Sequence, residues 1–282
     1  MNGWIDSWAL LNTVLIMFAL GLAWRPGDTR QQPAVLLRAT LGYNLLIPAL
    51  GLLVLASQTS WFQRDTVLAL GLCIAAGGGT SVGAFVQKTG AAPALTATLI
   101  MLLQGLSLIV IAGLAFFGVV QFDGFAFGVP AFGALSLADF AGFLLLITVA
   151  PFLAGIAVNW YWPQRSLRWQ PRLERAGSAL VLCLVAALML QYGPDVLSGP
   201  AEPLWAAATL VLLLVVPPLL FERQAVIRKT LVLVSLVRNL TLTLALLALM
   251  PQASALLPTV LAFGLAMYLM CGVLLWRWRA LR

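Results

Sequence analysis

The stretch Val232-Leu-Val-Ser-Leu-Val-Arg238-Asn239 places one charged residue, Arg238, in the middle of a segment that is otherwise apolar. Near the front of the chain, Gly77-Gly78-Gly79-Thr80-Ser81 interrupts a second apolar segment at about the same depth. Breaks of this kind are tolerated in hydrocarbon only where protein or a watery cavity supplies partners for the backbone. We therefore expect the two breaks to lie against each other in one site, held there by the other helices.

The composition indicates the class of protein. Of the 282 residues, 62% are hydrophobic and 9% are charged, and the mean hydropathy is +1.02, values typical of a polytopic membrane protein. The excess of 16 Lys and Arg over 9 Asp and Glu fits the positive-inside rule, so we expect a lipid bilayer and no nucleic acid as partner. The chain has no His, and Cys73, Cys183 and Cys271 lie in separate apolar runs, which predicts no metal site, no cofactor and no disulfide scaffold.

Apolar runs long enough to cross a bilayer predict an all-α membrane protein with nine transmembrane helices. They cover residues 8–24, 36–56, 66–87, 92–119, 136–158, 177–192, 204–221, 230–250 and 255–276. Placing the N-terminus outside puts nearly all Lys and Arg residues on the cytoplasmic side. The N-terminus lacks a basic region and a cleavage site, so the first run is expected to be a retained helix. We therefore expect a multi-pass protein of the plasma (inner) membrane with its C-terminus in the cytoplasm.

The segments before the basic stretch at 159–176 echo those after it, which predicts an internal repeat. Asn44-Leu-Leu-Ile-Pro48 and Leu214-Val-Val-Pro217-Pro218 occupy corresponding segments, and a polar break follows each. The repeats are offset by an odd number of crossings, so they are expected to run in opposite directions through the bilayer, a recurrent design of secondary transporters. Ordinary kinks at proline and glycine are the alternative.

These repeats divide the chain into three parts. Residues 1–158 are expected to form the first inverted repeat plus the first helix of the second half, 159–176 a cytoplasmic linker loop, and 177–282 the remainder of the second repeat.

Each break is expected to begin a new half-helix near the midplane. Thr80 or Ser81 is placed to cap the half-helix after the glycines, and Asn239 to cap the one after Arg238. Free amides at the two helix N-termini are then expected to face the crossing point, where Arg238 adds a full positive charge. No Asp or Glu lies within any apolar run to pair with it, which predicts an anionic substrate as its partner. The alternative is that the Arg238 side chain extends to the cytoplasmic interface.

In these stretches the chain resembles the bile acid:sodium symporter family. Gly78-Gly79-Thr80-Ser81 is similar to that family's Pro-Gly-Gly-Thr-Ser-Ser-Asn signature, and Arg238-Asn239 to its Gln-Asn crossing. The resemblance, to the family's nine-helix form, implies inverted repeats with two broken helices crossing at the midplane. It also implies a core domain and a panel domain that move against each other in alternating access. The core is formed by residues 36–119 and 204–276, and the panel by 8–24, 136–158 and 177–192.

The resemblance further implies which residues contact the substrate. The family's anion-contacting Thr and Asn are present as Thr80 and Asn239, whereas its sodium ligands are replaced here by Tyr43, Val82, Gly83, Val234 and Arg238. Losing a carboxylate and several oxygen donors removes what a hard cation needs, and a guanidinium in the same volume repels it. We therefore expect a sodium-independent secondary transporter of a small organic anion. The predicted substrate-binding residues are Gly78, Gly79, Thr80, Ser81, Gln104, Arg238 and Asn239.

Two other functions stay open at this point: a sodium-coupled organic anion symporter, as in the family, and a transporter-like receptor or sensor without flux. An enzyme is not expected, because without His and without embedded acids no nucleophile and base can be assembled. Gln104 is included in the site because it follows the first break by about the length that returns a helix to the midplane. The other polar residues within the spans, Asn12, Gln87, Ser107 and Thr243, are expected to form hydrogen bonds between helices, and Gln104 can do so as well. One guanidinium and two helix ends favour a single carboxylate as the ligand.

Overall fold

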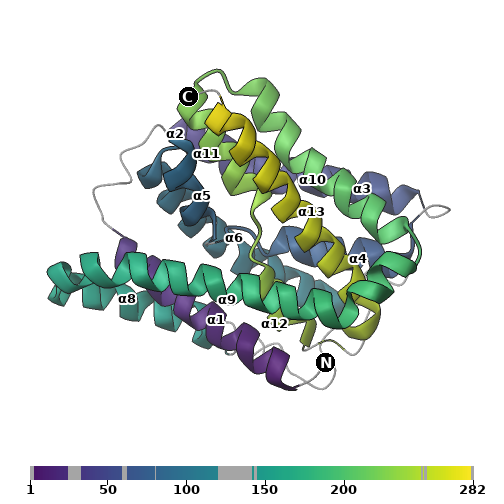
Figure 1. Cartoon of the computed structure of the whole chain (residues 1–282), viewed down its shortest axis with the longest axis horizontal. Helices are drawn as coiled ribbons and strands as arrows, with labels where there is room; N and C mark the ends of the chain where they lie inside the picture. Colours follow the sequence, from purple (N-terminus) through teal and green to yellow (C-terminus); the bar gives the residue numbers. More distant parts are fainter. Residues whose placement is uncertain are drawn as a thin grey trace.

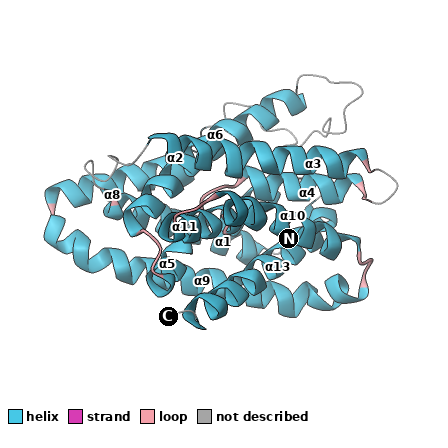
Figure 2. Ribbon diagram, turned by 90° about the horizontal axis from the view of Figure 1, so that it is seen from above, coloured by secondary structure: helices cyan, strands magenta, loops and turns pink. Residues whose placement is uncertain are grey.

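The computed structural model describes residues 3–24, 33–58, 62–79, 81–119, 142, 145–248, 250 and 253–280. Every regular element within these ranges is a helix (Figures 1 and 2). The predicted all-α class is therefore confirmed for the described part of the chain. Thr80 and residues 136–141, 143 and 144 of the predicted fifth span lie outside the described residues.

The helices follow the predicted apolar runs, with interruptions. Their bounds are α1 Gly3–Ala23, α2 Pro33–Leu37, η2 Arg38–Leu46, α3 Ile47–Ser57, α4 Arg64–Ala75, α5 Val82–Thr89, α6 Pro93–Val119, η3 Leu145–Val149, α8 Ala150–Tyr161, α9 Pro163–Ser198, α10 Glu202–Phe221, α11 Ala225–Leu236, α12 Leu240–Ala248 and α13 Ala253–Ala280. The π-helices η2 and η3 continue directly into α3 and α8.

Three of the described helices are long and apolar enough to cross a membrane: Pro33–Ser57, Glu202–Phe221 and Ala253–Trp278. This is the composition of a membrane protein. Each of the two predicted spans that contain a polar break is divided into two short helices. The first span forms α4 and α5, of 12 and 8 residues, and the second forms α11 and α12, of 12 and 9 residues. Pieces of that length do not cross a hydrocarbon core of about 30 Å alone, because a helix rises only about 1.5 Å per residue.

Both π-helices precede a proline. Pro48 follows η2 closely and Pro151 follows η3. Proline donates no backbone hydrogen bond and crowds the preceding turn, and a wider turn relieves that conflict. At the end of η2 the amide of Ile47 donates to the Gly42 carbonyl, so the proline is accommodated without breaking the span.

The prediction of a linker loop at residues 159–176 is wrong in one respect, because the chain is helical from Pro163 onward as part of α9. Proline is favoured in the first turn of a helix, where its missing N–H costs nothing. The Ser166 hydroxyl donates to the Leu22 carbonyl at 2.8 Å, so the start of α9 is tied to the end of α1. This tertiary contact supports a helix that the basic composition alone did not indicate.

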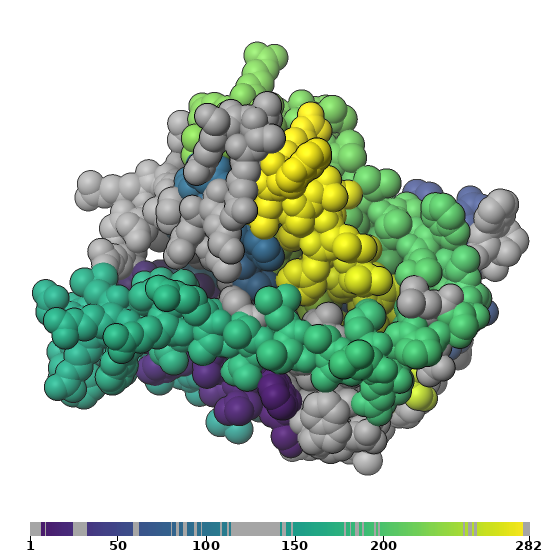
Figure 3. All heavy atoms as spheres, viewed as in Figure 1, coloured from purple at the N-terminus to yellow at the C-terminus, as the bar shows by residue number. Residues whose placement is uncertain are grey.

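The helices form two groups in Figure 1. Helices α1, α8 and α9 pack on one another along one side, and α10, α11 and α13 pack together on the other. In Figure 3 the teal surface of α8 and α9 runs below the yellow surface of α13. The groups touch where α9 meets α13 and where α1 meets α12. Within the second group α11 is central, since every residue from Thr230 to Leu236 is buried.

Candidate functional site

The two interruptions lie against each other in the interior, as the sequence predicts. The first separates α4 from α5, and the second separates α11 from α12. Their backbones are joined by two hydrogen bonds: the Gly79 amide donates to the Val237 carbonyl at 3.0 Å, and the Asn239 amide donates to the Ala76 carbonyl at 2.9 Å. Because these bonds run in both directions, each break supplies partners for the other's backbone.

The glycines of the first break are required by this crossing. Gly78 has a φ of +72°, a conformation that side-chain-bearing residues rarely adopt. A Cβ atom on Gly79 would lie 2.5 Å from the Arg238 carbonyl oxygen and 2.8 Å from the Val237 oxygen. Gly78 and Gly79, both predicted to bind substrate, therefore have an evident structural role in letting the two backbones approach.

Side chains from α6 and α13 satisfy the remaining backbone groups of the breaks. The Gly77 amide donates to Ser107 Oγ at 2.8 Å, and Gln104 Nε2 donates to the Gly78 carbonyl at 2.6 Å. The Arg238 amide donates to Met267 Sδ at 3.3 Å. The expectation of free amides facing the crossing point is thus wrong for Gly77, Gly79, Arg238 and Asn239, because buried backbone groups at a helix end find protein partners.

The predicted cap at the second break is confirmed. Asn239 Oδ1 accepts hydrogen bonds from the Leu242 amide at 3.1 Å and from Thr241 Oγ1 at 2.7 Å, which is the arrangement of a helix N-cap. Thr243 Oγ1 donates back to the Asn239 carbonyl at 3.1 Å. At the first break Ser81 is the N-cap residue of α5, but its side chain makes no capping hydrogen bond.

Arg238 is buried, with 2% of its surface exposed. Its guanidinium nitrogens Nε, Nη1 and Nη2 are buried and make no hydrogen bond to any of the described residues. Arg38 pairs with Glu222 at 2.7 Å, and this ion pair does not involve Arg238. The alternative in which the Arg238 side chain extends to the interface is therefore wrong, because the guanidinium stays inside the helix assembly.

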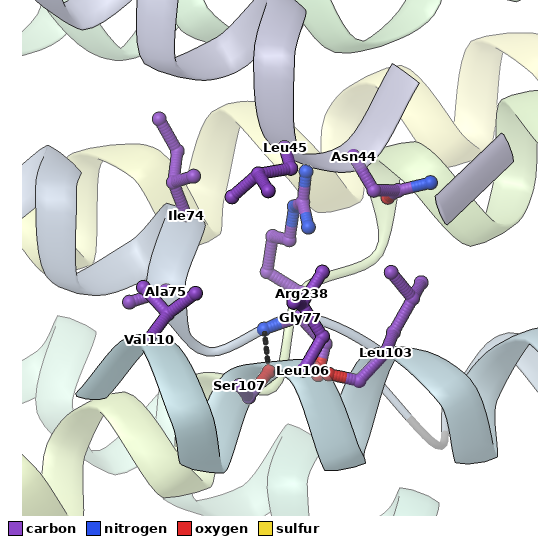
Figure 4. A pocket seen from close by; sticks show the side chains of 10 residues that line it. All are labelled: Asn44, Leu45, Ile74, Ala75, Gly77, Leu103, Leu106, Ser107, Val110 and Arg238. Carbon is purple, nitrogen blue, oxygen red and sulfur yellow. Dashed lines mark hydrogen bonds between the residues drawn. The ribbon is translucent and has the colours of Figure 1, made fainter. Parts of the chain in front are cut away.

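The guanidinium borders a small cavity (Figure 4). It points from the second break toward Asn44 and Leu45 of η2, with α6 on the opposite side. The cavity has a volume of about 20 Å³, which is room for about one water molecule. Its lining is otherwise mainly apolar: Asn44, Leu45, Ile74, Ala75, Gly77, Leu103, Leu106, Ser107, Val110 and Arg238.

Asn44 and Ser107 belong to this site although the predicted binding set omits them. Asn44 Nδ2 donates to the Ala39 carbonyl at 2.7 Å and to Ser235 Oγ at 3.2 Å, while its Oδ1 has no partner among the described residues. Both residues are polar side chains inside long apolar runs, which is the signal that points to them. Of the predicted residues, Arg238 lines the cavity, whereas Gly78, Gly79, Gln104 and Asn239 form the crossing beside it.

A second cavity, of about 290 Å³, lies where the first turns of α4, α10 and α13 meet. Asp65 and Glu202 are part of its lining. Their negative charges disfavour an anion there, so the Arg238 cavity is the better candidate for an anion site.

No protein-family model matches the chain, and no curated protein matches it.

Proposed function

We propose that this protein is a secondary transporter of a small organic anion, most simply a carboxylate, and that Arg238 supplies the positive charge of the binding site. The observation that carries the proposal is the buried guanidinium, at the crossing of two interrupted helices, whose three nitrogens lack partners within the described structure. A buried charge without a partner is expensive, in lipid as in a protein core. An anion that enters from water and pairs with it offsets this cost.

The absence of a sodium requirement follows from the same charge. A cation placed beside the guanidinium is repelled in a region of low dielectric constant. Transport in our proposal is therefore uniport or exchange. The resemblance to bile acid:sodium symporters supports the general architecture, while Arg238 stands where that family has Gln.

The proposal includes an inverted repeat, which the matching contacts of the two breaks support. Ser107 follows Gly77 in the chain and accepts the Gly77 amide, while Met267 follows Arg238 at nearly the same spacing and accepts the Arg238 amide. In each repeat, the second half of the broken helix is followed by a long helix, α6 or α13. A side chain of that long helix accepts a backbone hydrogen bond from the break. Within the predicted repeats, we take α2 to α6 and α10 to α13 as the parts that correspond to each other.

Helices α1, α8 and α9 are the proposed panel, and the helices that carry the crossing are the proposed core. The two groups meet along contacts of α9 with α13 and of α1 with α12. In alternating access the panel and core move against each other and expose the Arg238 cavity to one side of the membrane at a time. Such a motion is required because a cavity of about 20 Å³ does not hold an organic anion.

Uptake by proteoliposomes tests the proposal. Labelled monocarboxylates of increasing size are offered with an inward sodium gradient and with sodium replaced by potassium. We expect saturable uptake that is unaffected by the replacement, and a fall of about tenfold or more in Arg238→Gln, since removing one member of a buried charge pair costs about 2–5 kcal/mol.

Arg228→Gln is the matched control, because it removes the same charge from α11 at the end far from the break. Uptake that needs sodium and is unchanged in Arg238→Gln would contradict the proposal. Carboxylate binding without any flux would instead indicate the receptor alternative.

A further inference from the structure

The side chains around the cavity at Arg238 offer more free hydrogen-bond donors than free acceptors. Both hydrogens of the Asn44 amide are engaged, by Ala39 and Ser235. The Ser107 hydroxyl donates to the Leu103 carbonyl at 2.7 Å and accepts the Gly77 amide. Among the side chains of the described lining residues, the unpaired groups are the whole guanidinium of Arg238 on the donor side and Asn44 Oδ1 on the acceptor side. The guanidinium carries five N–H groups and keeps its charge at any physiological pH.

Charge and size together select the occupant. A net positive site that is otherwise lined mainly by apolar side chains calls for a negative partner, because a neutral molecule leaves the charge uncompensated. The volume of about 20 Å³ admits one water-sized particle. A carboxylate carries two oxygens and a carbon and is too large, whereas a halide ion is close to water in size.

We propose that the cavity formed by Arg238, Asn44, Ser107 and the adjoining apolar residues of α4 and α6 binds a single chloride ion. The ion occupies the site in the conformation described above and is displaced by the organic anion when the site opens. Only the displacement of chloride by the organic anion rests on the proposed function. Chloride binding itself depends only on the cavity and its charge.

Halide-dependent stability of the purified protein tests the proposal. Thermal melting is followed in detergent while sodium methanesulfonate, which carries no carboxylate, is replaced by sodium chloride or sodium bromide at constant sodium concentration and ionic strength. We expect a saturable rise in Tm with chloride and with bromide, because a ligand that binds only the folded state stabilises it. Methanesulfonate is too large for the cavity of about 20 Å³ and sets the baseline. Broadening of the chloride-35 NMR line by the protein, reversed by bromide, is the second measurement.

Two variants and one control locate the site. Arg238→Gln is expected to abolish the halide-dependent rise in Tm, and Ala75→Val, which adds volume at the cavity wall and keeps the charge, to raise the half-saturating concentration at least tenfold. Arg165→Gln removes an exposed arginine of α9 and is expected to retain the full response. If the first two variants fail to fold, the NMR measurement on the unmodified protein decides.

The outcomes separate this inference from the proposed function. Equal melting temperatures in chloride and methanesulfonate, with no line broadening, overturn chloride binding and indicate that water fills the cavity, even if carboxylate uptake is found. A halide response that persists in Arg238→Gln also overturns it, because the ion then binds elsewhere. Chloride binding with no carboxylate flux supports this inference and contradicts the transporter.

Discussion

Two glycines of the first break lie against Arg238, where the side chain of a larger residue would come too close to it. A Cβ atom on Gly77 would lie 3.3 Å from Arg238 Nη1, and one on Gly79 would lie 2.5 Å from the Arg238 carbonyl oxygen. The first contact concerns the guanidinium and the second the backbone. The glycine run thus serves the charge through Gly77 and the crossing through Gly79.

Gly79→Ala is expected to lower the free energy of unfolding by about 1–3 kcal/mol, the usual cost of overpacking an interior. The added methyl group must push apart the two backbones that are joined by the Gly79 and Asn239 hydrogen bonds. Thermal melting measures the change. Gly105→Ala on α6 is the control, because no described atom lies within 4 Å of a Cβ atom there. An unaltered Tm in Gly79→Ala would mean that the crossing opens without cost.

At the scale of elements, four of the predicted spans are interrupted or widened near a proline, a glycine run or Arg238, whereas α9, α10 and α13 continue through their prolines. Pro48 and Pro151 are accommodated by π-helical turns, while the glycine run and Arg238 end their helices altogether. Helices α1 and α8 show the opposite use of glycine. Gly21 and Gly155 face each other, and a Cβ atom on either would lie 2.9 Å from the Cα atom of the other.

Gly155→Val is therefore expected to separate α1 from α8 and to lower the stability by about 1–3 kcal/mol, measured as a fall in Tm. Close helix approach at small residues is a principal source of packing in membranes. Gly272→Ala on α13, where no described atom lies within 4 Å of a Cβ atom, is expected to leave Tm unchanged or slightly higher. Equal effects of the two substitutions would argue against the close approach.

At the scale of the whole molecule, the two ends of α10 mark opposite ends of the assembly, about 30 Å apart for 20 residues. The Gln63 amide, at the start of α4, donates to Glu202 at 2.5 Å. Arg38 pairs with Glu222 at the other end of α10, and Lys229 Nζ donates to the Thr89 carbonyl at 3.2 Å. The path from α4 to α5 therefore runs from the Glu202 end to the Glu222 end. The path from α11 to α12 starts at the Glu222 end and so runs the opposite way.

Labelling of single cysteines tests the predicted orientation. In a Cys183→Ser background, Ser198→Cys is expected to react with a membrane-impermeant maleimide in intact cells, and Arg223→Cys only after permeabilisation. Both positions are exposed, at the end of α9 and just after α10 respectively. The remaining native cysteines, Cys73 and Cys271, are buried. Labelling of both positions from one side would contradict the membrane crossing by α10.

The amino-acid sequence by itself determined the helical membrane class, the two breaks and the cap at Asn239. These features are local, since an apolar run, a glycine run or a charge within hydrocarbon constrains the chain at its own position. It also predicted hydrogen bonds between helices, which the structure confirms for Ser107 and Gln104. The Thr243 hydroxyl donates to the Asn239 carbonyl at the start of its own helix, and the Asn12 side chain has no partner among the described residues.

The tertiary structure alone decided which groups satisfy one another. It showed that the amides of the breaks are paired, that α9 begins within the basic stretch, and that Asn44 and Ser107 join Arg238 at a cavity of about 20 Å³. The physical reason is that a sequence shows which groups need a partner, whereas the partner comes from a helix that is distant in the chain. The guanidinium of Arg238 has no partner among the described residues, whereas neighbouring backbone amides of the two breaks are paired.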